Sequence, residues 1–203
     1  LLAARAEDTP TGLRWTRYDA AWGLESEPPP GTRNSFGWGT AVADLDLDGY
    51  PELVFTSRLG LRVFPGGPDG PRADNYYDLE TIFKGNLEVH VADLNRDGYL
   101  DLLVMALTYD DRPETMAASS TIFYGSKDGF STDRSENFPT YCYGTARLAD
   151  VNHDGYLDII VVDKHEWLKI YLGGPDGYSP ERTWDIELPA PRGVMLNVGD
   201  INK

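Results

Sequence analysis

The sequence predicts an all-β protein, a β-propeller built from four-stranded antiparallel blades. Two observations support this prediction. An acidic nine-residue loop recurs at intervals of about 50 residues and leads each time into a β-rich run. A second short β-rich run, which ends in a Gly/Asp turn, recurs within each interval. No stretch shows the period of an amphipathic helix, and four short strands per interval of this length are typical of a propeller blade.

The acidic loop occurs in three complete copies and the beginning of a fourth. The copies begin at Asp44, Asp93, Asp150 and Asp200, which are 49, 57 and 50 residues apart. Each complete copy has Asp or Asn at positions 1, 3 and 5, Gly at position 6, Tyr at position 7, and Asp or Glu at position 9. The oxygen-bearing positions are Asp44, Asp46, Asp48, Tyr50 and Glu52 in the first copy, Asp93, Asn95, Asp97, Tyr99 and Asp101 in the second, and Asp150, Asn152, Asp154, Tyr156 and Asp158 in the third.

This spacing predicts a calcium site in each loop. Ca²⁺ prefers six to eight oxygen ligands, and side chains at alternate positions can turn inward together. Glycine at position 6 permits a sharp turn with positive φ, the residue at position 7 would offer its backbone carbonyl, and position 9 would close the shell. We expect one Ca²⁺ per complete loop and a partial fourth site at Asp200 and Asn202.

Two other interpretations of the loop are less favourable. An EF-hand needs a bidentate Glu at position 12 between two helices, but position 12 is Phe55, Val104 or Val161 and lies in a predicted strand. A plain hairpin turn would account for one copy. Three copies with the same ligand spacing favour calcium.

The second landmark divides the chain into blades. It occurs at 63–70, 122–129 and 170–177, so we expect blades over about 36–84, 86–140 and 142–190. The first strand of a further blade is expected within 192–203, and residues 13–19 are expected to be the last strand of a preceding one. Residues 1–12 would be a leader or the remnant of a secretion signal. Three blades cannot close a ring, so the sequence predicts a partial propeller over 13–203.

Composition excludes several classes of function. The formal net charge of −15 argues against nucleic acid as a partner, because phosphate binding needs a basic surface. No apolar run reaches the roughly 18 residues of a membrane-spanning helix, so we expect no membrane insertion. Cys142 is the only cysteine and excludes an intrachain disulfide. Ten carboxylates lie in the three loops, and bound cations would offset their repulsion.

The loops, together with a Phe-Gly element, resemble the FG-GAP or VCBS repeat family, the blade type of integrin α-subunit propellers. Phe36-Gly37-Trp38-Gly39 precedes the first loop and Tyr143-Gly144 the third, whereas the second blade departs from the pattern with Asn86-Leu87-Glu88. The resemblance implies a calcium-binding propeller, commonly seven-bladed, that is extracellular, on the cell surface or periplasmic. It also implies a protein or carbohydrate ligand, and a ring completed by the same longer chain or by another chain.

Two functions stay open. The first is a non-enzymatic adhesion or binding module in which calcium is structural. The alternative is the propeller domain of a polysaccharide-degrading enzyme such as a lyase. His90, His153 and His165 have no evident nucleophile beside them, which favours the binding module.

The second blade contains seven or eight more residues than its neighbours, and the extra length falls within 108–117. Long loops on rigid scaffolds often bind ligands, and a second turn lies on the face opposite the first. We therefore expect a ligand face there. Its candidate residues are Tyr109, Asp110, Asp111 and Arg112 in the loop, and Arg33, Trp38, Tyr141 and Tyr143 at the blade crossings.

Overall fold

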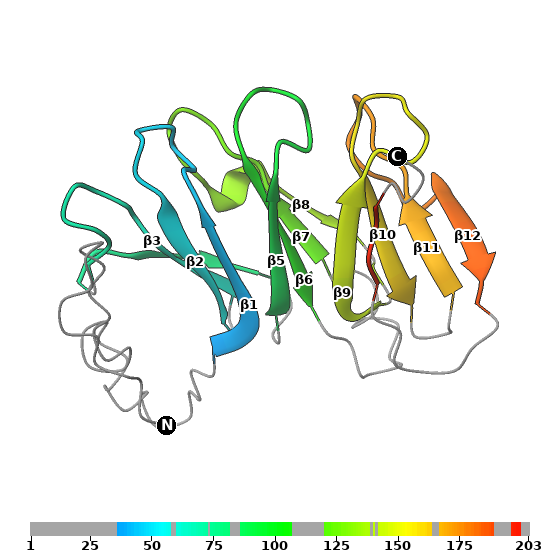
Figure 1. Cartoon of the computed structure of the whole chain (residues 1–203), viewed down its shortest axis with the longest axis horizontal. Coiled ribbons are helices and arrows are strands. Elements are labelled where there is room, and N and C mark those ends of the chain that lie inside the picture. Colours follow the sequence, from blue (N-terminus) through cyan, green and yellow to red (C-terminus); the bar gives the residue numbers. More distant parts are fainter. Residues whose placement is uncertain are drawn as a thin grey trace.

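The computed structural model describes residues 36–57, 60–72, 74–81, 86–106, 120–138, 140, 142–163, 167–188 and 196–199. Within these ranges the chain forms three antiparallel sheets of four strands each. One 3-10 turn, Thr132–Arg134, is the only helical element among them. The sheets stand side by side in the order of the sequence (Figure 1), which confirms the predicted all-β fold of four-stranded blades.

Each sheet is built from strands that follow one another in sequence. The first blade holds β1 (Phe36–Ala43), β2 (Glu52–Ser57), β3 (Gly60–Phe64) and β4 (Tyr77–Glu80). The second holds β5 (Asn86–Ala92), β6 (Asp101–Ala106), β7 (Ser120–Phe123) and β8 (Ser135–Phe138). The third holds β9 (Cys142–Ala149), β10 (Asp158–Asp163), β11 (Trp167–Tyr171) and β12 (Thr183–Glu187). Each strand pairs with the next one along the chain, as in a meander.

The first strand of each blade begins before the Ala/Val-rich residues that directly precede its acidic loop. In the first blade these residues are 40–43, which indicate a strand, but β1 begins at Phe36, which pairs with Ser57. The pairing shifts register between Phe36 and Thr40. Glycines at 37 and 39 weaken a strand signal, and such a bulge absorbs their irregular backbone.

Two hydrophobic clusters hold the three blades together. One joins the first and second blades, and the other joins the second and third. In β6, alternate side chains serve the two clusters: Leu102 and Val104 face the first blade, and Leu103 and Met105 face the third. All four are at most 1% exposed. A continuous apolar run in this strand therefore reflects burial on both sheet faces.

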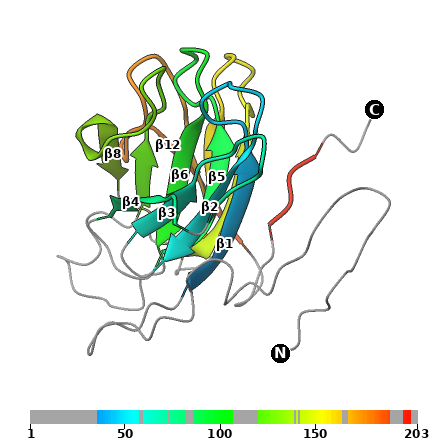
Figure 2. The same ribbon diagram turned by 90° about the vertical axis from the view of Figure 1, so that its left-hand side faces the viewer.

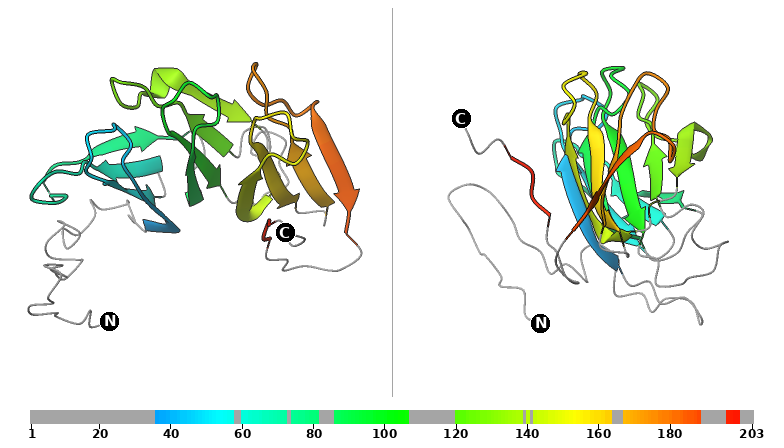
Figure 3. Two further views of the ribbon diagram at one scale, coloured as in Figure 1. Left: turned by 45° about the horizontal axis from the view of Figure 1, so that its top comes forward. Right: turned by 90° about the vertical axis from the view of Figure 1, so that its right-hand side faces the viewer.

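The acidic loops lie at one end of the blades. They are the turns β1–β2, β5–β6 and β9–β10, and Figure 2 shows them together at the top of the molecule. Figure 3 shows the sheets fanning apart from β1, β5 and β9. Contacts between β1 and β5 and between β5 and β9 join the blades along these strands. The repeated blade structure therefore places three chemically similar loops at the same end of the molecule.

Several predicted features lie outside the described residues. These are the leader and strand within 1–19, the long loop 108–117, and Asp200 with Asn202. Residues 196–199 form no strand, and the rest of the predicted first strand of a further blade lies outside the described ranges. These features stay predictions.

Candidate functional site

The three acidic loops share one backbone conformation. Glycine at position 6 has a φ of 93°, 92° and 93° at Gly49, Gly98 and Gly155, in the left-handed region that favours glycine. The predicted sharp turn is therefore present in each loop. Position 4 also has positive φ, namely 63°, 63° and 60° at Leu47, Arg96 and His153. The residue types at this position, Leu, Arg and His, give no sequence signal of that backbone geometry.

Side chains at positions 1, 3 and 5 turn toward the inside of the loop. In the second loop, the backbone N–H of Gly98 donates to Oδ2 of Asp93 at 3.0 Å, and that of Tyr99 donates to Oδ1 of Asp97 at 2.9 Å. Asn95 Oδ1 accepts from the backbone N–H of Asp97 at 3.0 Å. The third loop repeats this pattern at Asp150, Asn152 and Asp154.

The first loop brings three carboxylates close together, and one of their oxygens has no hydrogen-bond partner. Asp44, Asp46 and Asp48 each place a carboxylate oxygen within 4.8 Å of the others. Oδ2 of Asp44 accepts from the backbone N–H of Gly49 at 3.0 Å. Its other oxygen, Oδ1, is buried and has no hydrogen-bond partner. Because a buried, unpaired carboxylate oxygen is costly, this oxygen and its two acidic neighbours fit a divalent cation.

Position 9 has a structural role that the sequence did not reveal. The carboxylate of Asp101 is fully buried and accepts backbone hydrogen bonds from Leu94 at 2.8 Å and from Gly125 at 2.9 Å. Asp158 makes the matching pair with Val151 and Gly173. The position-9 carboxylate thus ties its own loop to the glycine two residues after the end of the third strand of the blade.

The partner glycines cannot be replaced without displacing the backbone. A Cβ at Gly125 would lie 2.2 Å from the carbonyl oxygen of Leu100, and one at Gly173 would lie 2.3 Å from that of Leu157. Glycine permits the close approach that the hydrogen bond from its N–H needs. The glycine of the Gly/Asp turn and the position-9 acid of the acidic loop are therefore partners in one hydrogen bond.

Burial controls the electrostatics of this carboxylate. Loss of solvent raises the pKa of Asp101 to about 6, and the negative charge of Asp97 adds to the increase. The hydrogen bonds from Gly125 and Leu94 oppose it. A nearby cation would favour the ionised form.

Two arginines, Arg96 and Arg182, act on the third loop. The guanidinium of Arg96, from the second loop, lies 5.2 Å from the ring centroid of Tyr156. The pKa of Asp154 is lowered, chiefly because Tyr156 donates a backbone hydrogen bond to it, and the charges of Arg182 and Arg96 contribute. Neighbouring loops are therefore linked through Arg96.

The structure describes few of the candidate ligand-face residues. Trp38 lies in β1 and Tyr143 in β9, and nothing further is described of their side chains. Arg33, Tyr109, Asp110, Asp111, Arg112 and Tyr141 lie outside the described residues. The predicted ligand face stays a prediction.

The described histidines do not form a nucleophile–base pair. Nε2 of His90 lies 3.3 Å from Oε2 of Glu88. The group beside this histidine is therefore a carboxylate and not a hydroxyl or thiol nucleophile. Glu88 stands in place of the Phe-Gly element in the second blade, and it accepts a hydrogen bond from the backbone N–H of Ala146 in the third at 2.9 Å. His153 is an exposed loop residue. His165 lies outside the described ranges.

The blades and their acidic first turns define a β-propeller protein. Residues 44–104 match the FG-GAP-like repeat family. Integrin α-6 of Homo sapiens is 26% identical over 163 residues, and integrin α-6 of Gallus gallus is 31% identical over 167. Each alignment covers 71% of this chain. A phosphatidylinositol-glycan-specific phospholipase D of Bos taurus is 31% identical over 154 residues, which are 62% of the chain.

Residues 44–104 are an FG-GAP-like repeat, and the chain is similar to integrin α-6. The aligned part spans 14% and 15% of the two integrins and 18% of the phospholipase D. In the described part of this chain, no helix is long and apolar enough to cross a bilayer.

Proposed function

We propose that this chain is part of an extracytoplasmic, calcium-binding propeller that binds a protein or carbohydrate ligand in adhesion. Two observations carry the proposal: carboxylate oxygens of Asp44, Asp46 and Asp48 lie within 4.8 Å of one another, and the buried Oδ1 of Asp44 lacks a hydrogen-bond partner. The similarity to integrin α-6 supports an adhesion-type module.

Each cation would be held by residues of one loop. Side chains at positions 1, 3 and 5 supply oxygens, and position 7 supplies its backbone carbonyl. The carboxylate at position 9 closes the shell and fixes the loop through its backbone hydrogen bonds. The ion supplies positive charge that offsets carboxylate repulsion. It therefore stabilises the turn between the first two strands of a blade and leaves ligand binding to other surfaces.

An extracytoplasmic location follows from the expected affinity. Loops with this ligand set are expected to bind more weakly than cytosolic buffers, in the range of about 10⁻⁴–10⁻³ M found for extracellular modules, so they would be empty at cytosolic calcium concentrations. The aspartates of the first loop are exposed or half-buried, as expected for sites in exchange with solvent.

Thermal unfolding with and without calcium tests the proposal. Calcium at ten times the dissociation constant should stabilise the folded protein by about 1.4 kcal/mol for each site. For three sites in a chain of this length, Tm should rise by about 10 °C above its value in EDTA. Potassium chloride at equal ionic strength is the control. Equal melting temperatures in calcium and EDTA would contradict the proposal.

A further inference from the structure

The three acidic loops differ at position 3, which is Asp46 in the first loop and an asparagine, Asn95 or Asn152, in the other two. The backbone φ angles at positions 4 and 6 are nearly the same in all three loops. Differences in hydrogen bonding among the loops therefore come from their side chains, and they show how well each loop holds its shape without an ion.

In the second and third loops, the asparagine amide compensates a neighbouring carboxylate. Nδ2 of Asn95 donates to Oδ2 of Asp97 at 3.0 Å. Oδ1 of Asp93 accepts from the backbone N–H of Asp97 at 3.1 Å. The third loop repeats both bonds at the same positions. These bonds satisfy carboxylate oxygens by means of the chain itself.

The first loop lacks both bonds. An ionised carboxylate has no hydrogen to donate, so Asp46 cannot bond to Asp48 as asparagine does. Oδ1 of Asp44 is buried and has no hydrogen-bond partner. Carboxylate oxygens of the three aspartates lie within 4.8 Å of one another. Repulsion and an unsatisfied oxygen thus remain in this loop until a cation enters it.

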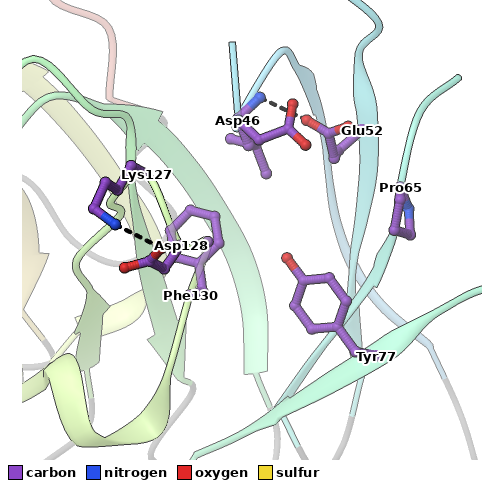
Figure 4. Close-up of a pocket in the computed structure, with 9 residues that line it drawn as sticks. Asp46, Glu52, Pro65, Tyr77, Lys127, Asp128 and Phe130 are labelled. Atoms are coloured by element: carbon purple, nitrogen blue, oxygen red, sulfur yellow. Dashed lines mark hydrogen bonds and ion pairs between the residues drawn. The ribbon is translucent and has the colours of Figure 1, made fainter. Parts of the chain in front are cut away.

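A fourth carboxylate increases the negative charge of the first loop. Figure 4 shows the carboxylate of Asp46 pointing toward that of Glu52, which is 4% exposed. Lys127 is the cation drawn beside them, but its Nζ pairs with Oδ1 of Asp128 at 2.9 Å. The first loop therefore holds four carboxylates, whereas each of the others holds three.

The third loop has the greatest compensation by positive charge. The charges of Arg96 and Arg182 both act on Asp154. A Cβ at Gly155 would lie 2.7 Å from a guanidinium nitrogen of Arg96, so this arginine lies directly against the loop. Two fixed positive charges reduce the attraction of the third loop for a further cation.

We propose that the three loops depend on calcium to different degrees, and that the first blade is the calcium-responsive part of the chain. The first loop takes up Ca²⁺ at the lowest concentration, because affinity rises with ligand charge, and it opens when the ion is removed. The second and third loops keep their conformation when empty, and the third binds most weakly. The inference rests on the proposed function and adds to it a regulation by calcium concentration.

Hydrogen exchange of the full chain over a series of buffered calcium concentrations tests the inference. Mass spectrometry follows 44–52, 93–101 and 150–158 as separate peptides. In EDTA, exchange in the first loop should be at least about ten times faster than in the second. The calcium concentration that gives half-maximal protection should be lowest for the first loop and highest for the third.

An exchange of side chains between loops gives matched variants. Asp46→Asn supplies the first loop with the missing amide, so it should slow exchange there in EDTA and raise the half-maximal calcium concentration about five- to ten-fold. Asn95→Asp should have the opposite effects in the second loop. Asp128→Asn makes the same chemical change in a turn outside the acidic loops and should alter neither quantity.

Equal exchange of the first and second loops in EDTA, or unchanged behaviour of both loop variants, would overturn the inference. Protection of the first loop by potassium chloride at equal ionic strength would also overturn it, since screening would then replace a bound ion. No protection by calcium in any loop contradicts the proposed function. Protection of all three loops at one calcium concentration contradicts the graded dependence alone.

Discussion

The backbone N–H of Gly66 donates a hydrogen bond to Oε1 of Glu52 at 2.9 Å. The other oxygen of the same carboxylate accepts from the backbone N–H of Leu45 at 2.6 Å. Glu52 therefore holds together the acidic loop, the second strand and the exit of the third strand. The second and third blades repeat this arrangement at Asp101 and Asp158.

Gly66→Ala should destabilise the protein by about 2 kcal/mol or more. The new Cβ would lie 2.6 Å from the carbonyl oxygen of Tyr50 and 2.7 Å from that of Pro51, so the backbone must shift. Gly67→Ala is the control, since a Cβ there meets nothing within 4 Å. Denaturant unfolding measures both variants. Equal stability of the two would show that the close approach at Gly66 is unimportant.

Leu47→Asn should stabilise the protein by about 0.5–1 kcal/mol. Leu47 has a φ of 63° and is 59% exposed, so it bears the cost of a left-handed backbone and buries little side chain. Asparagine tolerates this conformation. Val42→Asn, at a 64% exposed position in β1, makes a similar polar change on extended backbone and should lower Tm, because Asn is a poor strand former. Differential scanning calorimetry should show a higher Tm for the first variant, and a lower Tm would contradict the strain argument.

Glu88→Gln should lower stability by about 1–2 kcal/mol at pH 7. Burial alone would raise the pKa of Glu88, but contacts with His90, Ala146 and Arg147 outweigh it and hold the pKa below its usual value. Such a carboxylate stabilises the fold above its unfolded pKa of about 4.3, and the stabilisation is lost as pH falls through the folded pKa. The difference between wild type and variant should therefore shrink below about pH 4.

Glu80→Gln, at an exposed position in β4, is the control for Glu88→Gln. Urea unfolding at several pH values between 3 and 7 gives the difference in free energy of unfolding at each one. A difference that stays constant over that range would show that the ionised carboxylate does not link the second and third blades.

Arg96→Ala should raise the calcium affinity of the third loop about two- to five-fold at low salt. Its guanidinium lies beside Tyr156, and its charge acts on Asp154. Isothermal titration in a background with Asp48→Ala and Asp97→Ala isolates this site. Arg72→Ala removes an equal charge from an exposed pair with Asp74 and is the control. A fall in affinity, or the same rise in the control, would refute the coupling of neighbouring loops.

The repeat made most of the fold predictable, because each blade carries its own signals. The Gly/Asp turns and the acidic loops mark strand ends by local chemistry, as at Gly49 and Gly129, which both have positive φ. The start of β1 was less predictable, because glycines at 37 and 39 weaken the local strand signal. The strand extends over them because it pairs with β2.

The candidate site was only partly predictable. Alternating Asp and Asn side chains indicated inward-facing oxygens from sequence alone. The role of Glu52 depends on Gly66, fourteen residues away, and no local pattern links the two.

Calcium stoichiometry tests the central claim most directly. Isothermal titration of EDTA-stripped protein should give one calcium site for each complete loop, and Asp48→Ala should remove one site and leave the others unchanged. Ser126→Ala, in a turn outside the acidic loops, should retain the full number. An absence of calcium heat, or a number of sites that Asp48→Ala does not change, would contradict the account.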